Sequence, residues 1–250
     1  MPRRMVGRKS AREAPARPGS SARPARSSRP ARPPRRGPAG PPLLRLLLVP
    51  VAVTLGVTLA RLGGELLEWS PRLFGRAAGG GLGLVGIAWL VPIFGFYFGD
   101  RLARAGVRPS SLVRAVGWPI GALAVVPILA WLGSRLASTA TPQGHFVLWG
   151  VVSGLAAAFA LVAWPALGRA LLVYALAARL PVVAVMWFAI QSDWGTHYDA
   201  PPPGFPAVPP MARWLWTGVL PQMTIWIAWT VVVGMLFGAF GQVVAERRAE

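Results

Sequence analysis

Long stretches without any charged residue are the feature that most constrains how this chain folds. Asp, Glu, Lys and Arg are absent from residues 77–99, 115–134, 136–168 and 214–245. A helix needs about 20 residues, at 1.5 Å each, to cross the roughly 30 Å hydrocarbon core of a bilayer. Since several separate stretches reach that length, they predict several membrane-spanning helices. Barrel strands are disfavoured, because polar and apolar residues do not alternate.

Charge is also scarce in the chain as a whole. Only 14% of residues are charged and 54% are apolar, whereas about 25% charged residues is typical of a soluble domain. Residues 1–45 hold thirteen of the 26 basic residues and one acid, and so supply 13 − 1 = +12 of the net charge of +18. The rest of the chain has too little charge to cover a water-facing surface. The sequence therefore predicts an all-α, polytopic membrane helical bundle with about six transmembrane helices.

The predicted domain organisation is a tail followed by a six-helix transmembrane domain over residues 42–245. The six spans are predicted at residues 42–62, 79–99, 115–133, 146–167, 170–190 and 222–244. The stretch Met211–Leu220 is expected to form a short interfacial helix before the last span, because it carries an arginine and two tryptophans. Residues 246–250 are predicted to be a short cytoplasmic tail.

The first 41 residues are rich in Arg, Pro, Ala, Ser and Gly and have almost nothing apolar to bury. Such a composition predicts a disordered basic tail. Three interpretations remain open: a cytoplasmic tail attracted to anionic lipid, an organellar transit peptide, or a start codon assigned too far upstream. The concentration of positive charge in this tail gives no reason to expect a nucleic-acid partner for the body of the protein.

The distribution of arginine predicts the orientation in the membrane. With the N-terminus inside, the inner loops and C-terminus carry seven arginines and the outer loops carry five, before the basic tail is added to the inner side. By the positive-inside rule both termini are expected in the cytoplasm. Arginine outnumbers lysine 25 to 1, which is typical of a GC-rich genome, and the expected location is a bacterial inner membrane.

Helix packing has its own sequence pattern. Glycines four residues apart let two membrane helices approach closely, and prolines within spans favour kinks. The glycine pairs are Gly95/Gly99, Gly150/Gly154 and Gly234/Gly238, and the prolines are Pro92, Pro127, Pro181 and Pro221.

The loop after the fifth span collects polar residues. Asp193, His197 and Asp199 lie within seven residues and would supply oxygen and nitrogen ligands to a divalent cation such as zinc. On the predicted topology His145, Glu65 and Glu68 face the same outer compartment, which favours a metal-ligating or proton-handling cluster there. The simpler alternative is a water-exposed loop shaped by an Asp–Gly turn, since the spacing matches no known metal motif.

Arg179 lies near the middle of the fifth predicted span. A charge at bilayer depth is costly, so such a residue usually faces the bundle interior and binds something, and a guanidinium suits an anion. The alternative is that residues 170–178 lie along the interface, which would bring Arg179 to water. No acid within any predicted span would pair with it.

A third basic group follows the second predicted span. Arg101, Arg104 and Arg108 fall on one helical face and are expected to bind phosphate headgroups of lipid.

No sequence motif of a known enzyme class is present. The chain lacks cysteine, which excludes disulfides, thiolate nucleophiles and iron–sulfur clusters, and it lacks the hydrolase, metalloprotease and nucleotide-binding motifs. The leading expectation is a non-catalytic membrane subunit or accessory protein, with a membrane-protein partner or a second copy of itself. The alternatives are a small-solute or ion transporter that uses Arg179, and a metal-dependent enzyme or sensor with the outer-face site. No cofactor is predicted except that divalent metal.

Overall fold

The computed structural model describes residues 41–80, 84–136 and 141–250, and within these ranges it is helical without strands. Six helices of some length follow one another: α1 (Leu43–Leu66), α2 (Leu90–Arg104), α3 (Leu112–Leu136), α4 (Pro142–Ala163), α5 (Pro165–Ser192) and α8 (Ile225–Arg247). Short elements fill the gaps: the 3-10 turn η1 (Ala78–Gly80), α6 (Pro210–Arg213), the π-helical η2 (Trp214–Val219) and α7 (Leu220–Met223). The predicted tail, residues 1–41, lies outside the described residues except for Pro41.

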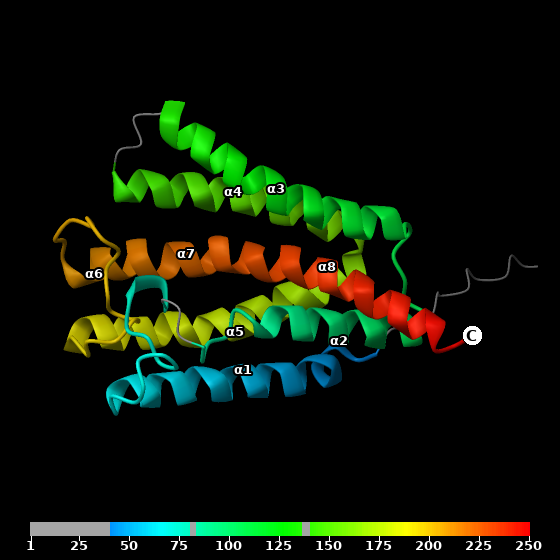
Figure 1. Ribbon diagram of the computed structural model, residues 1–250, viewed down its shortest axis with the longest axis horizontal. Helices are drawn as coiled ribbons and strands as arrows, with labels where there is room; N and C mark the ends of the chain where they lie inside the picture. Colours follow the sequence, from blue (N-terminus) through cyan, green and yellow to red (C-terminus); the bar gives the residue numbers. More distant parts are fainter. Residues whose placement is uncertain (1–40, 81–83, 137–140) are drawn as a thin grey trace, which may run out of the picture. The chain divides into compact units, whose positions relative to one another are not determined.

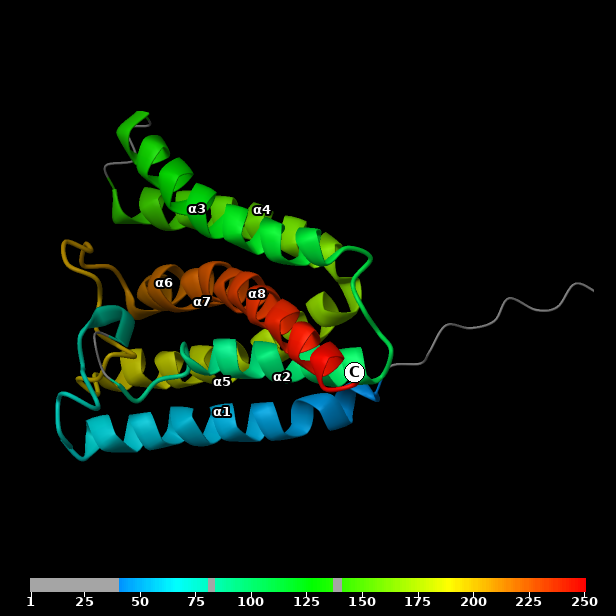
Figure 2. The ribbon, with the colours of Figure 1, turned by 45° about the vertical axis from the view of Figure 1, so that its right-hand side comes forward.

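The helices lie roughly antiparallel in layers (Figure 1). Helices α3 and α4 pack against each other on one side, α1 lies on the opposite side against α5, and α8 runs between them in contact with α2, α3, α4 and α5. The view in Figure 2 shows the same order. Helix α8 is thus the central element of the bundle.

Apolar side chains face outward on the flanking helices. Ile120, Ile128 and Trp131 of α3 are more than half exposed, as are Leu48 and Leu59 of α1. Water-soluble monomers rarely expose apolar surface this extensive. In the part of the chain that the structure describes, five helical segments are long and apolar enough to cross a membrane: Leu43–Leu66, Leu112–Gly133, Pro142–Ala163, Pro165–Ser192 and Pro210–Arg247. The chain is a membrane protein of the helical-bundle class.

Two of the predicted glycine pairs, Gly95/Gly99 and Gly234/Gly238, contact each other where α2 crosses α8. A methyl group at Gly95 would overlap the backbone of Gly234, and one at Gly99 would overlap the backbone of Gly238. Backbone therefore touches backbone where α2 crosses α8, as small residues permit in membrane bundles. Gly154 of the third pair has no atom near its missing Cβ, so that pair does not form a comparable contact.

The prediction of a helix over residues 79–99 was wrong in its first half. Helix α2 begins at Leu90, and its 15 residues span roughly 22 Å, less than the hydrocarbon core. Gly79 has a φ of 70°, which interrupts a helix, and residues 84–89 form bends and turns. Arg61 donates hydrogen bonds to the carbonyl oxygens of Gly75 and Val85 and so holds this irregular segment against α1.

The boundary between the fourth and fifth helices also differs from the prediction. The chain turns at Trp164, which has φ −147° and ψ 86°, because a residue before proline is disfavoured in the helical region and Pro165 follows. Helix α5 then runs unbroken through Pro181 to Ser192. Arg179 therefore lies in the middle of a continuous helix, and the alternative of an interfacial segment over residues 170–178 was wrong.

The segment before α8 is helical but interrupted. Residues 214–219 form a π-helix, and Thr224 breaks the helix again with φ −116° and ψ −75°. Irregular backbone within a membrane is tolerated where it lines a cavity. Thr217, Pro221 and Gln222 of this segment line a cavity.

Candidate functional site

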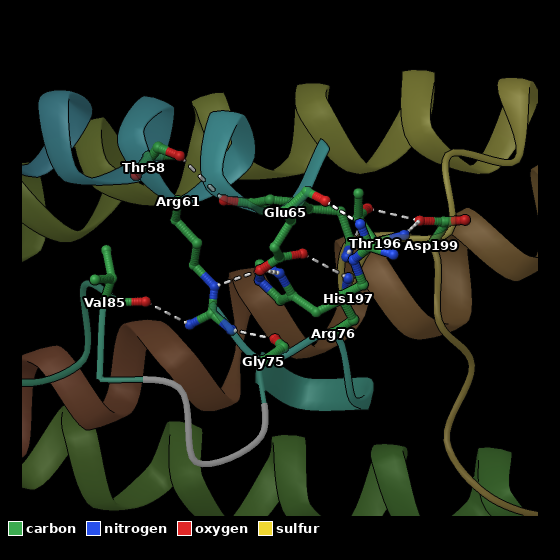
Figure 3. Close-up of polar contacts among 10 residues, drawn as sticks. Thr58, Arg61, Glu65, Gly75, Arg76, Val85, Thr196, His197 and Asp199 are labelled. Atoms are coloured by element: carbon green, nitrogen blue, oxygen red, sulfur yellow. Dashed lines mark hydrogen bonds and ion pairs between the residues drawn. The ribbon is translucent and has the colours of Figure 1, made fainter. Parts of the chain in front are cut away.

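A network of charged side chains joins α1 to the loop after α5 (Figure 3). Glu65, only 1% exposed, accepts a hydrogen bond at Oε1 from Arg61 Nε at 2.8 Å and another from His197 Nδ1 at 2.6 Å. Its Oε2 accepts the backbone N–H of His197 at 2.9 Å. Both carboxylate oxygens are therefore used, and Arg61 supplies the opposite charge that a buried carboxylate requires.

The loop that presents His197 is braced by its own hydrogen bonds. Asp199 accepts the N–H groups of Gly195 and Thr196 and the Thr196 hydroxyl at 2.6–2.9 Å. Tyr198 is buried and its hydroxyl lies 3.4 Å from the carbonyl oxygen of Thr58 in α1. These contacts fix the loop to α1, so the position of the imidazole is set from both sides.

The partners of His197 define its protonation state. An ionised carboxylate only accepts hydrogen bonds, so Nδ1 carries the proton that Glu65 receives. Burial lowers the pKa of His197, the contact with Glu65 opposes that shift, and the positive charge of Arg61 adds to the lowering. His197 is therefore neutral near pH 7, with the lone pair of Nε2 available. No hydrogen bond to Nε2 is present in the described part of the chain.

Arg179 is buried in the bundle, and no acidic residue among those that the structure describes forms an ion pair with it. It is 4% exposed, its Nη1 lies 3.3 Å from Oε1 of Gln222, and its guanidinium carbon lies 4.8 Å from the ring centroid of Trp226. Its Nε is buried without a hydrogen-bond partner among the described residues. The Nε–Nη2 edge is the one that forms two parallel hydrogen bonds to a carboxylate or a similar oxyanion.

Arg179, Arg61 and His197 line one cavity of about 370 Å³. The cavity lies between α1, α5, the turns before α2, and the interrupted segment that leads into α8. Most of its wall is apolar or aromatic, with Val182, Met186, Ile225 and Trp226 among the contributors, and no described lining residue is an acid. A volume of this size with apolar walls and few polar groups is typical of a small-molecule site, and the charge favours an anion.

The predicted metal ligands are not gathered into a ligand set. Asp193 is exposed at the end of α5, Asp199 is used by its own loop, and His197 points to Glu65. Residues 41–80, 84–136 and 141–250 contain no group of three His, Asp or Glu arranged to hold a metal ion. His145 lies in the first turn of α4, where its Nδ1 is 3.1 Å from the carbonyl oxygen of Thr141.

The two glutamates predicted to face the outer compartment have separate surroundings. Glu65 is the buried centre of the network, whereas Glu68 lies beyond the end of α1 with φ 54° and an exposed side chain 3.4 Å from Arg76. The sequence predicted His197 and both glutamates in one outer compartment, and the structure brings His197 into contact with Glu65.

The predicted lipid-facing arginines lie at the other end of the bundle. Arg104 forms an ion pair with Asp100 at 2.8 Å, Arg108 forms one with Glu246 at 3.1 Å, and Arg101 lies over the ring of Tyr97. All three remain at the surface, and their binding of lipid headgroups stays a prediction.

Several residues of the site were not singled out from the sequence. Arg61 lies one residue before the predicted end of the first span, where no role is predicted for it, whereas α1 continues to Leu66 and makes Arg61 a position within the helix. Its spacing of four residues from Glu65 is the ordinary helical ion-pair spacing and would have been the available signal. Gln222 and Trp226 carried no signal, since their importance comes from contact with Arg179.

Comparisons with known proteins add no identification: no family model matches this sequence, and neither the curated proteins nor the solved structures contain a match.

Proposed function

We propose that this protein is a multi-pass integral membrane protein that carries small organic anions, with Arg179 as the anion-binding residue. The supporting observation is Arg179 itself: its Nε is buried without a hydrogen-bond partner among the described residues, and its side chain lines a cavity that has no acidic lining residue among those described. Burying such a charge is costly, and an anion from outside would offset that cost. The apolar and aromatic wall selects anions that have an apolar body.

The interrupted helix before α8 supports transport and not only binding. Thr217, Pro221, Gln222 and Ile225 of the interrupted segment all line the cavity. Membrane carriers commonly place their substrate site where helices are broken near the middle of the bilayer. A break of this kind allows the two halves of the segment to move separately while the anion stays bound.

The orientation follows the surface charge. The start of α1 and the C-terminus lie at the same end of the bundle (Figure 1), and that end carries the larger number of arginines outside the tail. We place this end of the bundle in the cytoplasm of a bacterial cell, with the network of Arg61, Glu65 and His197 on the outer side. The basic tail and the surface arginines would then contact anionic lipid.

Flux measurements test this function. Benzenesulfonate is a suitable probe, because it is permanently anionic and crosses lipid poorly on its own. Proteoliposomes containing the full chain are expected to take up radiolabelled benzenesulfonate, and Arg179→Gln is expected to reduce the initial rate at least tenfold. Arg169→Gln, an exposed arginine on the same helix, should leave the rate unchanged. Equal rates for Arg179→Gln and the wild type would contradict the proposal.

Replacing Arg179 by methionine is expected to stabilise the ligand-free protein. A residue of similar shape without charge removes a burial cost of about 2.5–3.5 kcal/mol and loses only the contacts with Gln222 and Trp226. We expect a net gain of about 1–3 kcal/mol, in line with replacements of buried charges by apolar side chains. Thermal unfolding in detergent without added anion measures it. A fall in melting temperature would indicate that Arg179 supports the fold and not a ligand.

A further inference from the structure

The imidazole of His197 belongs to a residue that lines the cavity, and one of its two nitrogens is fixed by Glu65. Oε1 of Glu65 lies 2.6 Å from His197 Nδ1, and the backbone N–H of His197 donates a hydrogen bond to Oε2 of Glu65. The side chain lines the cavity, and no residue in the described ranges bonds to Nε2. A carboxylate that fixes one imidazole nitrogen in this way leaves the other available as a proton acceptor.

The charges that face His197 come from three elements. Helix α1 contributes Arg61 and Glu65, whose opposite charges cancel at 2.8 Å. The turn after α1 contributes Arg76, which donates to the backbone carbonyl of Glu65. The loop of His197 itself contributes Asp199, whose carboxylate is taken up by Gly195 and Thr196, and the neutral Tyr198, while Val182 and Met186 of α5 are apolar.

Protonation of His197 therefore raises the net charge beside the cavity by one. Arg61 and Glu65 together carry no net charge, so Arg61, Glu65 and a protonated His197 together carry +1. Arg179 lines the same cavity from α5. An anion in this cavity would be attracted by both cations. The bound anion would in turn strengthen proton binding to His197 by the same factor, because coupling between two binding sites is reciprocal.

We infer that His197 is a proton-binding site of the cavity and that a small organic anion enters together with a proton on His197 Nε2. This inference rests on the proposed function, since it concerns the same cavity. The proton comes from the outer aqueous phase and forms a bond only with Nε2, so no further reactant is required. The protein would thereby use a proton gradient to accumulate the anion.

The affinity for benzenesulfonate as a function of pH tests the inference. The charge of the probe does not change between about pH 5 and about pH 8, so any pH dependence of binding comes from the protein. Histidine is the side chain whose ordinary pKa lies in this range. Burial places the pKa of His197 below its ordinary value of 6.5, and affinity should rise as the pH falls through that pKa. We expect a gain of roughly tenfold, within the range of known couplings.

Two variants assign the effect to one of the two histidines of the chain. His197→Asn keeps a side-chain N–H for Glu65 but cannot be protonated, and its affinity should not change with pH. His145→Gln removes the histidine of α4, which does not line the cavity, and should retain the wild-type pH dependence. A pH dependence that survives in His197→Asn, or is lost in His145→Gln, would overturn the inference.

Proton uptake provides a measurement that needs no substitution at His197. Calorimetric titration of the wild type with benzenesulfonate, in buffers of different ionisation enthalpy, reports the protons taken up on binding. Uptake of a substantial fraction of one proton at mildly acidic pH supports the inference. Binding without proton uptake overturns it and leaves the proposed function standing, whereas no binding at any pH overturns the proposed function itself.

Discussion

Glu65→Gln is expected to lower the free energy of unfolding by about 3–5 kcal/mol, the usual cost of removing one partner of a buried ion pair. The neutral amide cannot compensate the charge of Arg61, which is 7% exposed. Its NH₂ group cannot accept a hydrogen bond from His197, whereas the carboxylate accepts one at each oxygen. Three segments lose their common contact, because Arg61 also binds the irregular stretch at Gly75 and Val85. A chemical unfolding titration in mixed micelles measures the loss.

Glu68→Gln is the matched control for this prediction. The two glutamates are three residues apart and carry the same charge, yet the Glu68 side chain is 78% exposed and only 3.4 Å from a half-exposed Arg76. Exposed pairs of this kind contribute about 0–1 kcal/mol. Similar effects of the two substitutions would mean that the buried network does not stabilise the fold.

Gly99→Ala is expected to destabilise the bundle by about 1–3 kcal/mol or more. The added methyl group would overlap the carbonyl oxygen of Gly238. Since that atom belongs to the backbone of the central helix, no side-chain rotation relieves the overlap, and α2 must move away from α8. Thermal unfolding in detergent reports the loss.

Gly154→Ala provides the comparison for the helix crossing. Nothing lies within 4 Å of the position that its methyl group would occupy. Alanine is the better helix former, by roughly 0.5–1 kcal/mol, so this variant should be as stable as the wild type or slightly more stable. If Gly99→Ala proved equally harmless, the close approach of α2 and α8 would be wrong.

The pattern of apolar residues was sufficient to predict the fold class, because burial in lipid dictates long uncharged helices. It could not predict where α2 begins, since residues 84–89 are as apolar as a helix but are held as turns by Arg61. Nor could it predict that Gly95 and Gly99 contact Gly234 and Gly238. Spacing identifies a helix face that is able to pack closely, but the partner is decided by the three-dimensional arrangement.

The candidate site was predictable only in pieces. Arg179 stood out because a charge within an apolar span is costly, and His197 stood out because polar residues gather in its loop. The contact between Glu65 and His197 joins positions 132 residues apart, and no local pattern reports such a distance. The unpaired Nε of Arg179 is a property of packing, because it depends on which described groups fail to reach this atom.

The most direct test of the account compares two probes of the same shape on two proteins. Benzenesulfonate is anionic and benzenesulfonamide is neutral near pH 7, and equilibrium dissociation constants are measured for the wild type and Arg179→Gln in phosphatidylcholine nanodiscs. Because hydrogen bonds between ionised groups are worth about 1.5–3 kcal/mol, we predict that the wild type prefers the anion at least tenfold. The preference should disappear in Arg179→Gln. A preference for the anion that persists without Arg179, or no preference in the wild type, would contradict the proposal that Arg179 binds the anion.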